Sequence, residues 1–239
     1  MNELSGDSAV GGRVCVSIGF DTLAESIAAA KQAEKGADVI EIRLDSISDP
    51  GIAPFMDAIT TPLLFTNRPV WEGGLFSGKE EERIKLLLEA VRAGAAFVDI
   101  ELRSDRSSRE RILNEVRNGS NTRVIISWHD FSGTPSVTDL ERIFQDQSES
   151  GADVGKIVCT ALTYQDVLKV LNLQLSAAEA NFPLIAFSMG KAGVISRAAT
   201  LELGGFMTYA ASDTGKITAP GQLSVSALRS ILNAIKANA

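Results

Sequence analysis

The chain has 239 residues, 45% of them hydrophobic, which is enough to bury a large core. Its 23 lysine and arginine residues against 30 aspartate and glutamate residues give a net charge of −7, and no segment concentrates the basic residues, so nucleic-acid binding is not expected. No stretch approaches the roughly 18 apolar residues of a membrane helix, so membrane association is not expected either.

The first twelve residues, MNELSGDSAVGG, are small and polar and lack the basic start and apolar centre of a secretory signal. We expect a disordered tail over residues 1–12 and one domain over residues 13–239. Cys15 and Cys159 both fall in apolar, strand-like runs, which favours two small buried thiols over a functional pair. Such thiols fit a reducing cytoplasm best.

From residue 13 onward, short β-branched runs alternate with longer segments in which apolar residues recur every three or four positions. The short runs predict strands at Arg13–Ile18, Val39–Leu44, Pro62–Thr66, Phe97–Leu102, Arg123–Trp128, Asp153–Cys159, Pro183–Ser188 and Phe206–Tyr209. The longer segments predict helices at Thr22–Lys35, Pro54–Ile59, Lys79–Ala93, Ser107–Arg117, Thr138–Ser150, Tyr164–Gln174, Val194–Leu201 and Val225–Ala237. Eight such units predict an α/β fold, a single-domain (β/α)8 TIM barrel, with a doubly wound open sheet as the alternative.

Charged residues alternate with apolar ones in two of these strands. Glu41 and Arg43 share one face of their strand, and Asp99 and Glu101 share one face of theirs. If the apolar faces pack on outer helices, both pairs point into a barrel, towards the mouth where active sites of this fold are built. This placement favours the barrel over the open sheet. A mutually neutralising Glu41–Arg43 pair of structural value alone is the competing interpretation.

The only histidine, His129, comes where the apolar run Val124–Trp128 ends. Imidazole titrates near pH 6.5 and therefore donates and accepts protons at physiological pH. Transition-metal sites usually need several His or Cys ligands, and this chain has one histidine and two well-separated cysteines. We expect acid-base chemistry and no metal, with a strand-end histidine bonded to backbone as the alternative.

Lys156 has apolar neighbours on the strand that follows the one ending in His129, so a barrel would bring the two side chains together. A lysine that apolar residues desolvate gives up its proton more readily and becomes an amine nucleophile able to form an imine with a carbonyl. The alternative is a buried ion pair between Lys156 and Asp99, Glu101 or Glu41.

Three further stretches follow predicted strands and would face the same mouth. Arg68 follows the third strand, and Glu72 lies four residues on in a glycine-bearing loop, where a carboxylate could orient an imidazole. Arg197 follows the seventh strand and could clamp a carboxylate with two nitrogens. Thr218 and Gln222 follow the eighth and suit a polyol. Each alone fits a solvated surface equally well, but their shared location strengthens the set.

Taken in order, these residues resemble those of type I 3-dehydroquinate dehydratase, the imine-forming dehydratase of the shikimate pathway. The similarity runs from about residue 13 to the C-terminal helix. The segments that carry it are Glu41–Arg43, Phe65–Arg68, Glu72–Gly74, Asp99–Glu101, His129–Phe131 with Thr134–Pro135, Lys156, Ser188–Gly190, Ser196–Arg197 and Ala219–Gln222. One departure is Thr218, where the family pattern has serine; threonine keeps the hydroxyl and adds a methyl group.

The resemblance implies an enzyme that converts 3-dehydroquinate to 3-dehydroshikimate in aromatic amino-acid biosynthesis, without a metal or an organic cofactor. It implies a cytoplasmic homodimer. Lys156 would form the imine with the substrate ketone, His129 would move the protons, and Glu72 would orient His129. Arg197 would pair with the substrate carboxylate. The residues implied to contact the substrate hydroxyls are Glu41, Arg43, Arg68 and Gln222, with Thr218 and Ser17 as further candidates.

Two other functions stay open. An imine-forming aldolase-type lyase of the same fold would use a similar lysine, although many such enzymes bind phosphorylated sugars. This chain lacks a clear glycine-rich phosphate cradle after the last two strands and offers Arg197 instead. A non-catalytic barrel that binds a small acid is the second alternative, and the presence of His129, Lys156 and Glu72 together argues against it.

Overall fold

A nearly closed cylinder of parallel strands forms the centre of the molecule. The computed structural model describes residues 12–213 and 219–238, which form eight parallel strands in the order β7-β6-β5-β4-β3-β2-β1-β8. The strands are β1 Arg13–Ile18, β2 Val39–Arg43, β3 Leu63–Thr66, β4 Phe97–Glu101, β5 Arg123–Asp130, β6 Val154–Thr160, β7 Leu184–Met189 and β8 Met207–Ala211. Where β8 meets β7, the amide of Phe206 donates to the carbonyl of Leu184 at 2.9 Å. The predicted (β/α)8 barrel is therefore confirmed over the open sheet.

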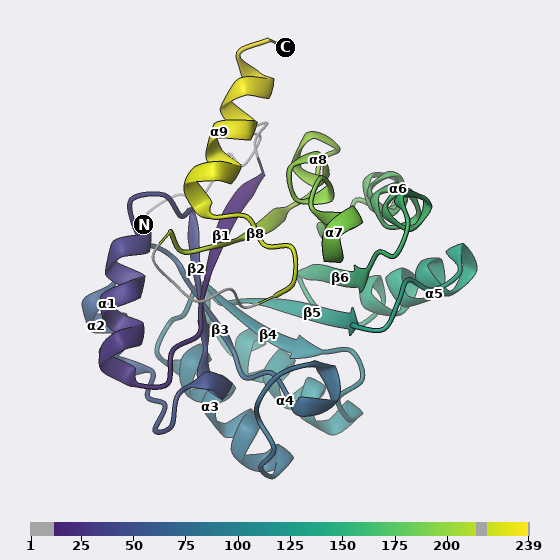
Figure 1. The fold of residues 1–239 in the computed structure, drawn as a ribbon. Helices are drawn as coiled ribbons and strands as arrows, with labels where there is room; N and C mark the ends of the chain where they lie inside the picture. Colours follow the sequence, from purple (N-terminus) through teal and green to yellow (C-terminus); the bar gives the residue numbers. More distant parts are fainter. Residues whose placement is uncertain (1–11, 214–218, 239) are drawn as a thin grey trace.

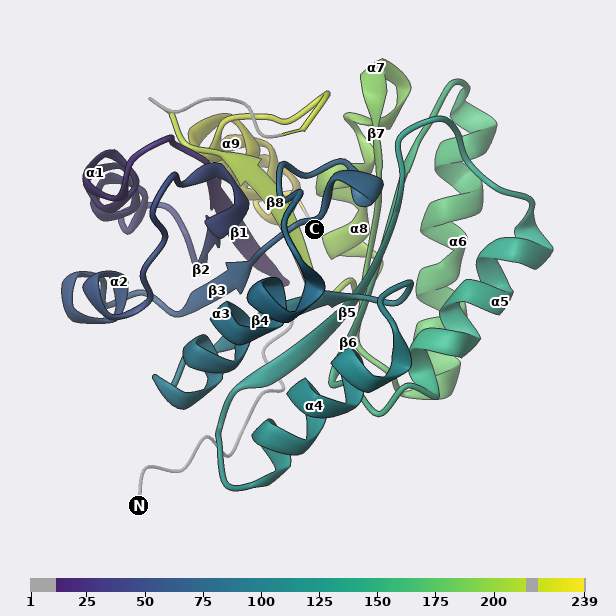
Figure 2. The same ribbon diagram turned by 90° about the horizontal axis from the view of Figure 1, so that it is seen from below.

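Helices surround the strands in chain order (Figure 1). They are α1 Leu23–Ala33, α2 Ala53–Ala58, α3 Glu80–Arg92, α4 Arg106–Arg117, α5 Val137–Ser148, α6 Tyr164–Ala180, α7 Gly190–Gly193, α8 Ser196–Glu202 and α9 Val225–Lys236, with short 3-10 turns η1 Leu44–Ser46 and η2 Val70–Glu72. Figure 2 shows α5 and α6 side by side along the outside of the strands that they follow. The chain thus runs from each strand through a helix on the outer face to the next strand, because parallel strands need such a crossover connection.

Three predicted boundaries differ from the structure in ways that matter. Strand β5 continues to Asp130, so His129 lies inside the strand. Strand β8 continues through two alanines to Ala211, which the pattern missed because alanine has little strand preference. Helix α6 runs on to Ala180 through an alanine-rich segment whose apolar periodicity fades although its helix propensity is high.

The barrel interior is apolar at one end and charged above it. Its buried apolar floor includes Cys15, Val39, Leu64, Phe97, Ile125, Val154 and Met207. Glu41, Asp99 and Lys156 come two residues after members of this floor, on β2, β4 and β6, so the strand period of two turns them into the same interior. The charged layer therefore lies nearer the carboxyl ends of the strands.

Both cysteines are free thiols and buried, as the sequence predicted. In the described part of the chain, no helix is both long and apolar enough to cross a membrane. Apart from Gly12, the predicted tail lies outside the described residues, and so does Thr218.

Candidate active site

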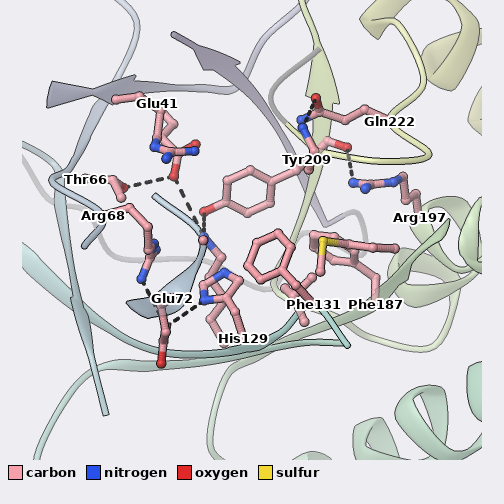
Figure 3. A pocket seen from close by; sticks show the side chains of 16 residues that line it. Glu41, Thr66, Arg68, Glu72, His129, Phe131, Phe187, Arg197, Tyr209 and Gln222 are labelled. Atoms are coloured by element: carbon pink, nitrogen blue, oxygen red, sulfur yellow. Dashed lines mark hydrogen bonds and ion pairs between the residues drawn. The ribbon is translucent and has the colours of Figure 1, made fainter. Parts of the chain in front are cut away.

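A cavity opens at the carboxyl ends of the strands, where active sites of this fold lie, and encloses about 510 Å³ of space that includes open solvent at its mouth. Predicted site residues on its wall are Glu41, Arg43, Arg68, Glu72, His129, Lys156, Arg197 and Gln222. Figure 3 shows Glu41, Thr66 and Arg68 on one side of the cavity, and Arg197 and Gln222 on the other, with the ring of Tyr209 between them. The sequence therefore identified the polar side chains of the wall except for Thr66 and Tyr209.

Lys156 projects from β6 with its amine among polar atoms. Its Nζ lies 3.1 Å from Asp99 Oδ2, 3.0 Å from Tyr209 Oη and 3.8 Å from Glu41 Oε1. The buried ion pair considered as the alternative to imine chemistry is thus present, with Asp99 and Glu41 but without Glu101. Lys156 also lines the cavity, so the ion pair holds the amine where a ligand can meet it.

Arg68 ties the carboxylates of the barrel together. Its guanidinium lies 2.8 Å from Asp99 and 2.6 Å from Glu101, and 3.5 Å from Glu72. Burial alone would lower the pKa of Arg68, but Asp99 and Glu101 outweigh burial and raise it. Burial likewise opposes ionisation of Asp99, and Arg68 and Lys156 overcome it and lower the pKa of that carboxyl. Arg68 therefore helps to keep Asp99 charged, and few of its donors are left for a substrate.

A second arginine, Arg83, completes this network and was missed by the sequence analysis. It is fully buried on α3 and bonds the other oxygen of Glu101 at 2.5 Å and the hydroxyl of Ser104 at 2.8 Å. The available signal was its position four residues before Leu87, which places Arg83 on the apolar face of the helix. Such a signal is weak, because long basic side chains on a helix usually reach water.

His129 is paired with Glu72. The imidazole Nδ1 lies 2.9 Å from Glu72 Oε2, so the alternative of a histidine bonded only to backbone is wrong. Burial, with the cations Arg68 and Lys156, lowers the pKa of His129 well below 6.5. Burial also raises the pKa of Glu72 to about 8, against the effect of Arg68. The imidazole is therefore neutral near pH 7, and among the described residues its Nε2 has no hydrogen-bond partner.

The turn that carries Glu72 is built around a glycine. Gly73 ends η2 with φ 76°, a left-handed conformation that glycine adopts without strain. A Cβ at Gly73 would also collide with the ring of Phe131, which stacks on His129 with centroids 6.3 Å apart. Glycine here therefore lets the loop close over Phe131 and bring Glu72 to the imidazole.

Arg103 supports the same pair from outside the cavity, and sequence reasoning did not find it. Its guanidinium donates to the His129 carbonyl at 3.0 Å and lies 3.6 Å from Glu72 Oε1. It also lies over the ring of Trp128, 4.8 Å from the centroid. Arg103 thus helps to fix both partners of the pair.

Arg197 is a fully buried cation on the cavity wall, at the start of α8. Within residues 12–213 and 219–238, its guanidinium donates only to backbone carbonyls, those of Tyr209 at 3.1 Å, Gly221 at 3.0 Å and Pro220 at 3.3 Å. No carboxylate of the described residues pairs with it, and desolvation lowers its pKa to about 10. A buried charge without a counter-ion is costly, so this wall favours an anionic ligand group.

Ser196 fixes the position of the neighbouring Arg197. Its hydroxyl accepts from the amide of Ser188 at 2.8 Å and donates to the carbonyl of Gly193 at 2.5 Å, which ties the turn between α7 and α8 to the end of β7. Gly193 sits so close to Ser188 that a Cβ would collide with its backbone. This packing holds the guanidinium at the cavity.

Glu41 and Arg43 do not neutralise each other, so the structural-pair interpretation is wrong. Arg43 forms a two-pronged ion pair with Asp45, at 2.9 and 2.6 Å. Glu41 instead accepts hydrogen bonds from Ser17 at 2.5 Å and Thr66 at 2.9 Å. Ser17 does not line the cavity, so its contact is with Glu41 and not with the space a ligand would fill.

Tyr209 is the largest omission of the sequence analysis. Its hydroxyl bonds Lys156 Nζ and its ring lines the cavity. Gln222, which was predicted, accepts the amide hydrogen of Ala219 at 3.3 Å. Across residues 12–213 and 219–238, no three histidine, cysteine, aspartate or glutamate side chains gather as a metal site would need.

Comparison with known proteins gives consistent matches along the chain. Residues 14–239 match the family described as Type I 3-dehydroquinase. A 3-dehydroquinate dehydratase of Desulfotalea psychrophila is 46% identical over 219 residues, 92% of this chain and 96% of that protein. One from Methanococcus maripaludis strain C7 is 35% identical over 222 residues, 93% of this chain and 99% of the relative. The crystal structure of type I 3-dehydroquinate dehydratase from Clostridium difficile with covalently modified comenic acid has a TM-score of 0.88 and 29% identity, covering 96% of this chain and 94% of that one.

The lowered pKa of His129 can be measured directly by NMR titration, because the chain has one histidine and its imidazole signals need no assignment. We expect a midpoint well below 6.5 in the folded protein and a midpoint near 6.5 in urea. The variant Lys156→Met should raise the folded midpoint, since it removes a cation that disfavours the imidazolium. A folded midpoint at or above 6.5 would contradict this account of the site.

Proposed function

The chain belongs to the type I 3-dehydroquinase family and is a 3-dehydroquinate dehydratase of the shikimate pathway, and we propose that Lys156 forms the imine on which its reaction depends. Enzymes of this family eliminate water from 3-dehydroquinate through a Schiff base. The aldolase-type lyase and the non-catalytic barrel are set aside by this membership.

Three side chains that line the same cavity support this proposal. A buried amine, a neutral imidazole and a buried guanidinium without a carboxylate partner among the described residues line one cavity. Lys156 supplies the amine, His129 the base and Arg197 the anion clamp. A ketone that bears a carboxylate matches all three groups at once.

The chemistry proceeds from Lys156. Its amine adds to the ketone and water departs, leaving an iminium that withdraws electrons from the neighbouring carbon. His129 Nε2 removes a proton from that carbon, and the electron pair then expels the β-hydroxyl, which leaves as water with the proton from His129. Hydrolysis of the product imine returns the ketone and the free amine.

Glu72 and Arg197 set the geometry of these steps. In its ionised form Glu72 accepts the Nδ1 proton of His129, so that Nε2 is free to face the substrate, and the carboxylate then stabilises the imidazolium that forms. The carboxylate of 3-dehydroquinate is on the carbon that loses the hydroxyl. Arg197 would therefore fix the leaving group relative to His129 by binding that carboxylate.

The remaining wall residues suit the ring hydroxyls of the substrate. Glu41, Arg43 and Gln222 present a carboxylate, a guanidinium and an amide to the cavity. Arg68 also lines it, although its ion pairs leave it mainly a supporting role. Ser17 would act through Glu41, and Thr218 is retained as a contact only on the family resemblance.

We also propose a homodimer that forms through α6 in the cytoplasm, where the thiols of Cys15 and Cys159 stay reduced. Tyr164, Leu168 and Leu175 recur along one face of α6 and are 72%, 67% and 62% exposed. An apolar stripe of this kind on a surface helix is typical of a protein interface.

Borohydride reduction tests the role of Lys156. In the presence of 3-dehydroquinate, we expect the reductant to inactivate the enzyme and to leave one stable adduct on the peptide that contains Lys156, found by peptide mass mapping. Lys156→Met should give neither turnover nor adduct. Turnover of substrate without any adduct on Lys156 would overturn the imine assignment.

The variant His129→Ala tests the proton-transfer role. It should still bind the ketone and be trapped by borohydride, but dehydrate roughly 10² to 10⁴-fold more slowly, because the general base is missing. The kcat from initial rates of product formation measures this. Near-normal turnover in the variant would remove His129 from the mechanism.

The variant Leu168→Glu tests the interface. Light scattering should give the unaltered protein twice the chain mass of 25.4 kDa and the variant a single chain mass, because a charge on the stripe opposes its burial. Ile235→Glu, at an exposed apolar position on α9, is the matched control and should stay dimeric. A monomeric unaltered protein, or a dimeric Leu168→Glu, counts against the proposed interface.

A further inference from the structure

Tyr209 is held against the reacting amine by its surroundings. Its hydroxyl lies 3.0 Å from Lys156 Nζ, and the side chain is buried while still lining the cavity. Its ring packs on Phe187, with centroids 5.8 Å apart, and its backbone carbonyl accepts from Arg197. Figure 3 shows the ring extending across the cavity from β8. The steps proposed above give this side chain no role.

Imine formation poses a proton problem at Lys156. An ammonium has no lone pair, so Nζ must lose a proton before it attacks, and the ketone oxygen must gain one as it becomes a hydroxyl. Both transfers happen in a cavity whose wall is largely buried. A group that accepts from Nζ and donates to the substrate oxygen would serve both.

The two carboxylates near Nζ are poorly suited to this transfer. Asp99 does not line the cavity, and Ser127 and Arg68 occupy its oxygens at 2.6 and 2.8 Å. Arg68 and Lys156 lower its pKa despite burial, so it holds a proton weakly. Glu41 lies farther from Nζ, at 3.8 Å, and both of its oxygens already accept hydrogen bonds.

The phenol has the required donor and acceptor in one atom. Tyr209 Oη accepts from Lys156 Nζ, and among the described residues nothing accepts its own proton. Burial, with the negative charge of Glu41, raises the pKa of Tyr209 well above 10, so a free tyrosinate is strongly disfavoured. The phenol must therefore gain one proton as it gives up the other.

We propose that Tyr209 is a catalytic residue of imine formation, which passes a proton from Lys156 to the substrate oxygen. This rests on the proposed role of Lys156. As Nζ attacks, one ammonium proton moves to Oη, the phenolic proton moves to the ketone oxygen, and a neutral tyrosine and an N-protonated carbinolamine result. The C–N bond forms as the C=O π bond breaks. A second proton transfer, from the nitrogen to the new hydroxyl, releases water and leaves the iminium. Overall, the ketone and the ammonium give the iminium and one water.

The background His129→Ala isolates this step, because imine forms in it but elimination is slow. Enzyme in excess over 3-dehydroquinate is quenched with borohydride at increasing times, and the adduct on Lys156 is measured by mass. Adding Tyr209→Phe, which keeps the ring packing, should slow adduct formation roughly 10²-fold. Tyr164→Phe in the same background is the matched control, since Tyr164 is the only other tyrosine and lies on α6 outside the cavity, where Phe keeps the apolar ring of the proposed interface. It should leave the rate unchanged.

The pH dependence separates proton relay from a structural role. Without the relay, the amine must lose its proton to solvent, so the rate of adduct formation with Tyr209→Phe should rise more steeply with pH than with Tyr209 present. Adduct formation at an unchanged rate and with an unchanged pH profile, even with a lowered melting temperature, would overturn the proposal. Failure of every variant, including the unaltered protein, to form an adduct on Lys156 would instead overturn the proposed function.

Discussion

The site depends on a buried charge network that Arg68 holds together. Removing carboxylates, guanidinium groups and an ammonium from water costs several kcal/mol for each ion, and only close pairing offsets that cost. Arg68 contacts Asp99 and Glu101, and Asp99 in turn holds Lys156. The amine is thereby fixed at the cavity wall, and burial together with the surrounding positive charge lowers the pKa of His129 and keeps it neutral. The proposed nucleophile thus owes its position to the same ions that disfavour a charged imidazole on the proposed base.

This arrangement follows from the period of the strands, which is why much of it could be predicted. Alternation along β2 and β4 turned Glu41 and Asp99 inwards, and consecutive strands brought His129 beside Lys156. Parallel strands end at one mouth, so Glu72 and Arg197, which follow β3 and β7, gather there too. Strand order and periodicity are local properties of the sequence, and the barrel converts them into proximity.

Pairing between side chains could not be predicted in the same way. Alternation along β2 places Arg43 on the same face as Glu41. The Arg43 guanidinium nevertheless pairs with both carboxylate oxygens of Asp45, which lies in the turn η1. Tyr209 was the last residue of the predicted strand and was passed over, whereas the two alanines that follow extend β8 beyond it. Arg83 comes from a helix outside the barrel. In each case the partner depends on side-chain reach and backbone angles, which hydrophobic periodicity does not encode.

The central claim is that Lys156 and Arg197 hold the two ends of one substrate, and the structure of the borohydride-reduced complex tests it most directly. We expect continuous density from Lys156 Nζ to the ring carbon of the former ketone, with the ligand carboxylate bound to the Arg197 guanidinium and Nε2 of His129 facing the intervening carbon. A carboxylate bound elsewhere, or a ligand without a bond to Lys156, would contradict this account.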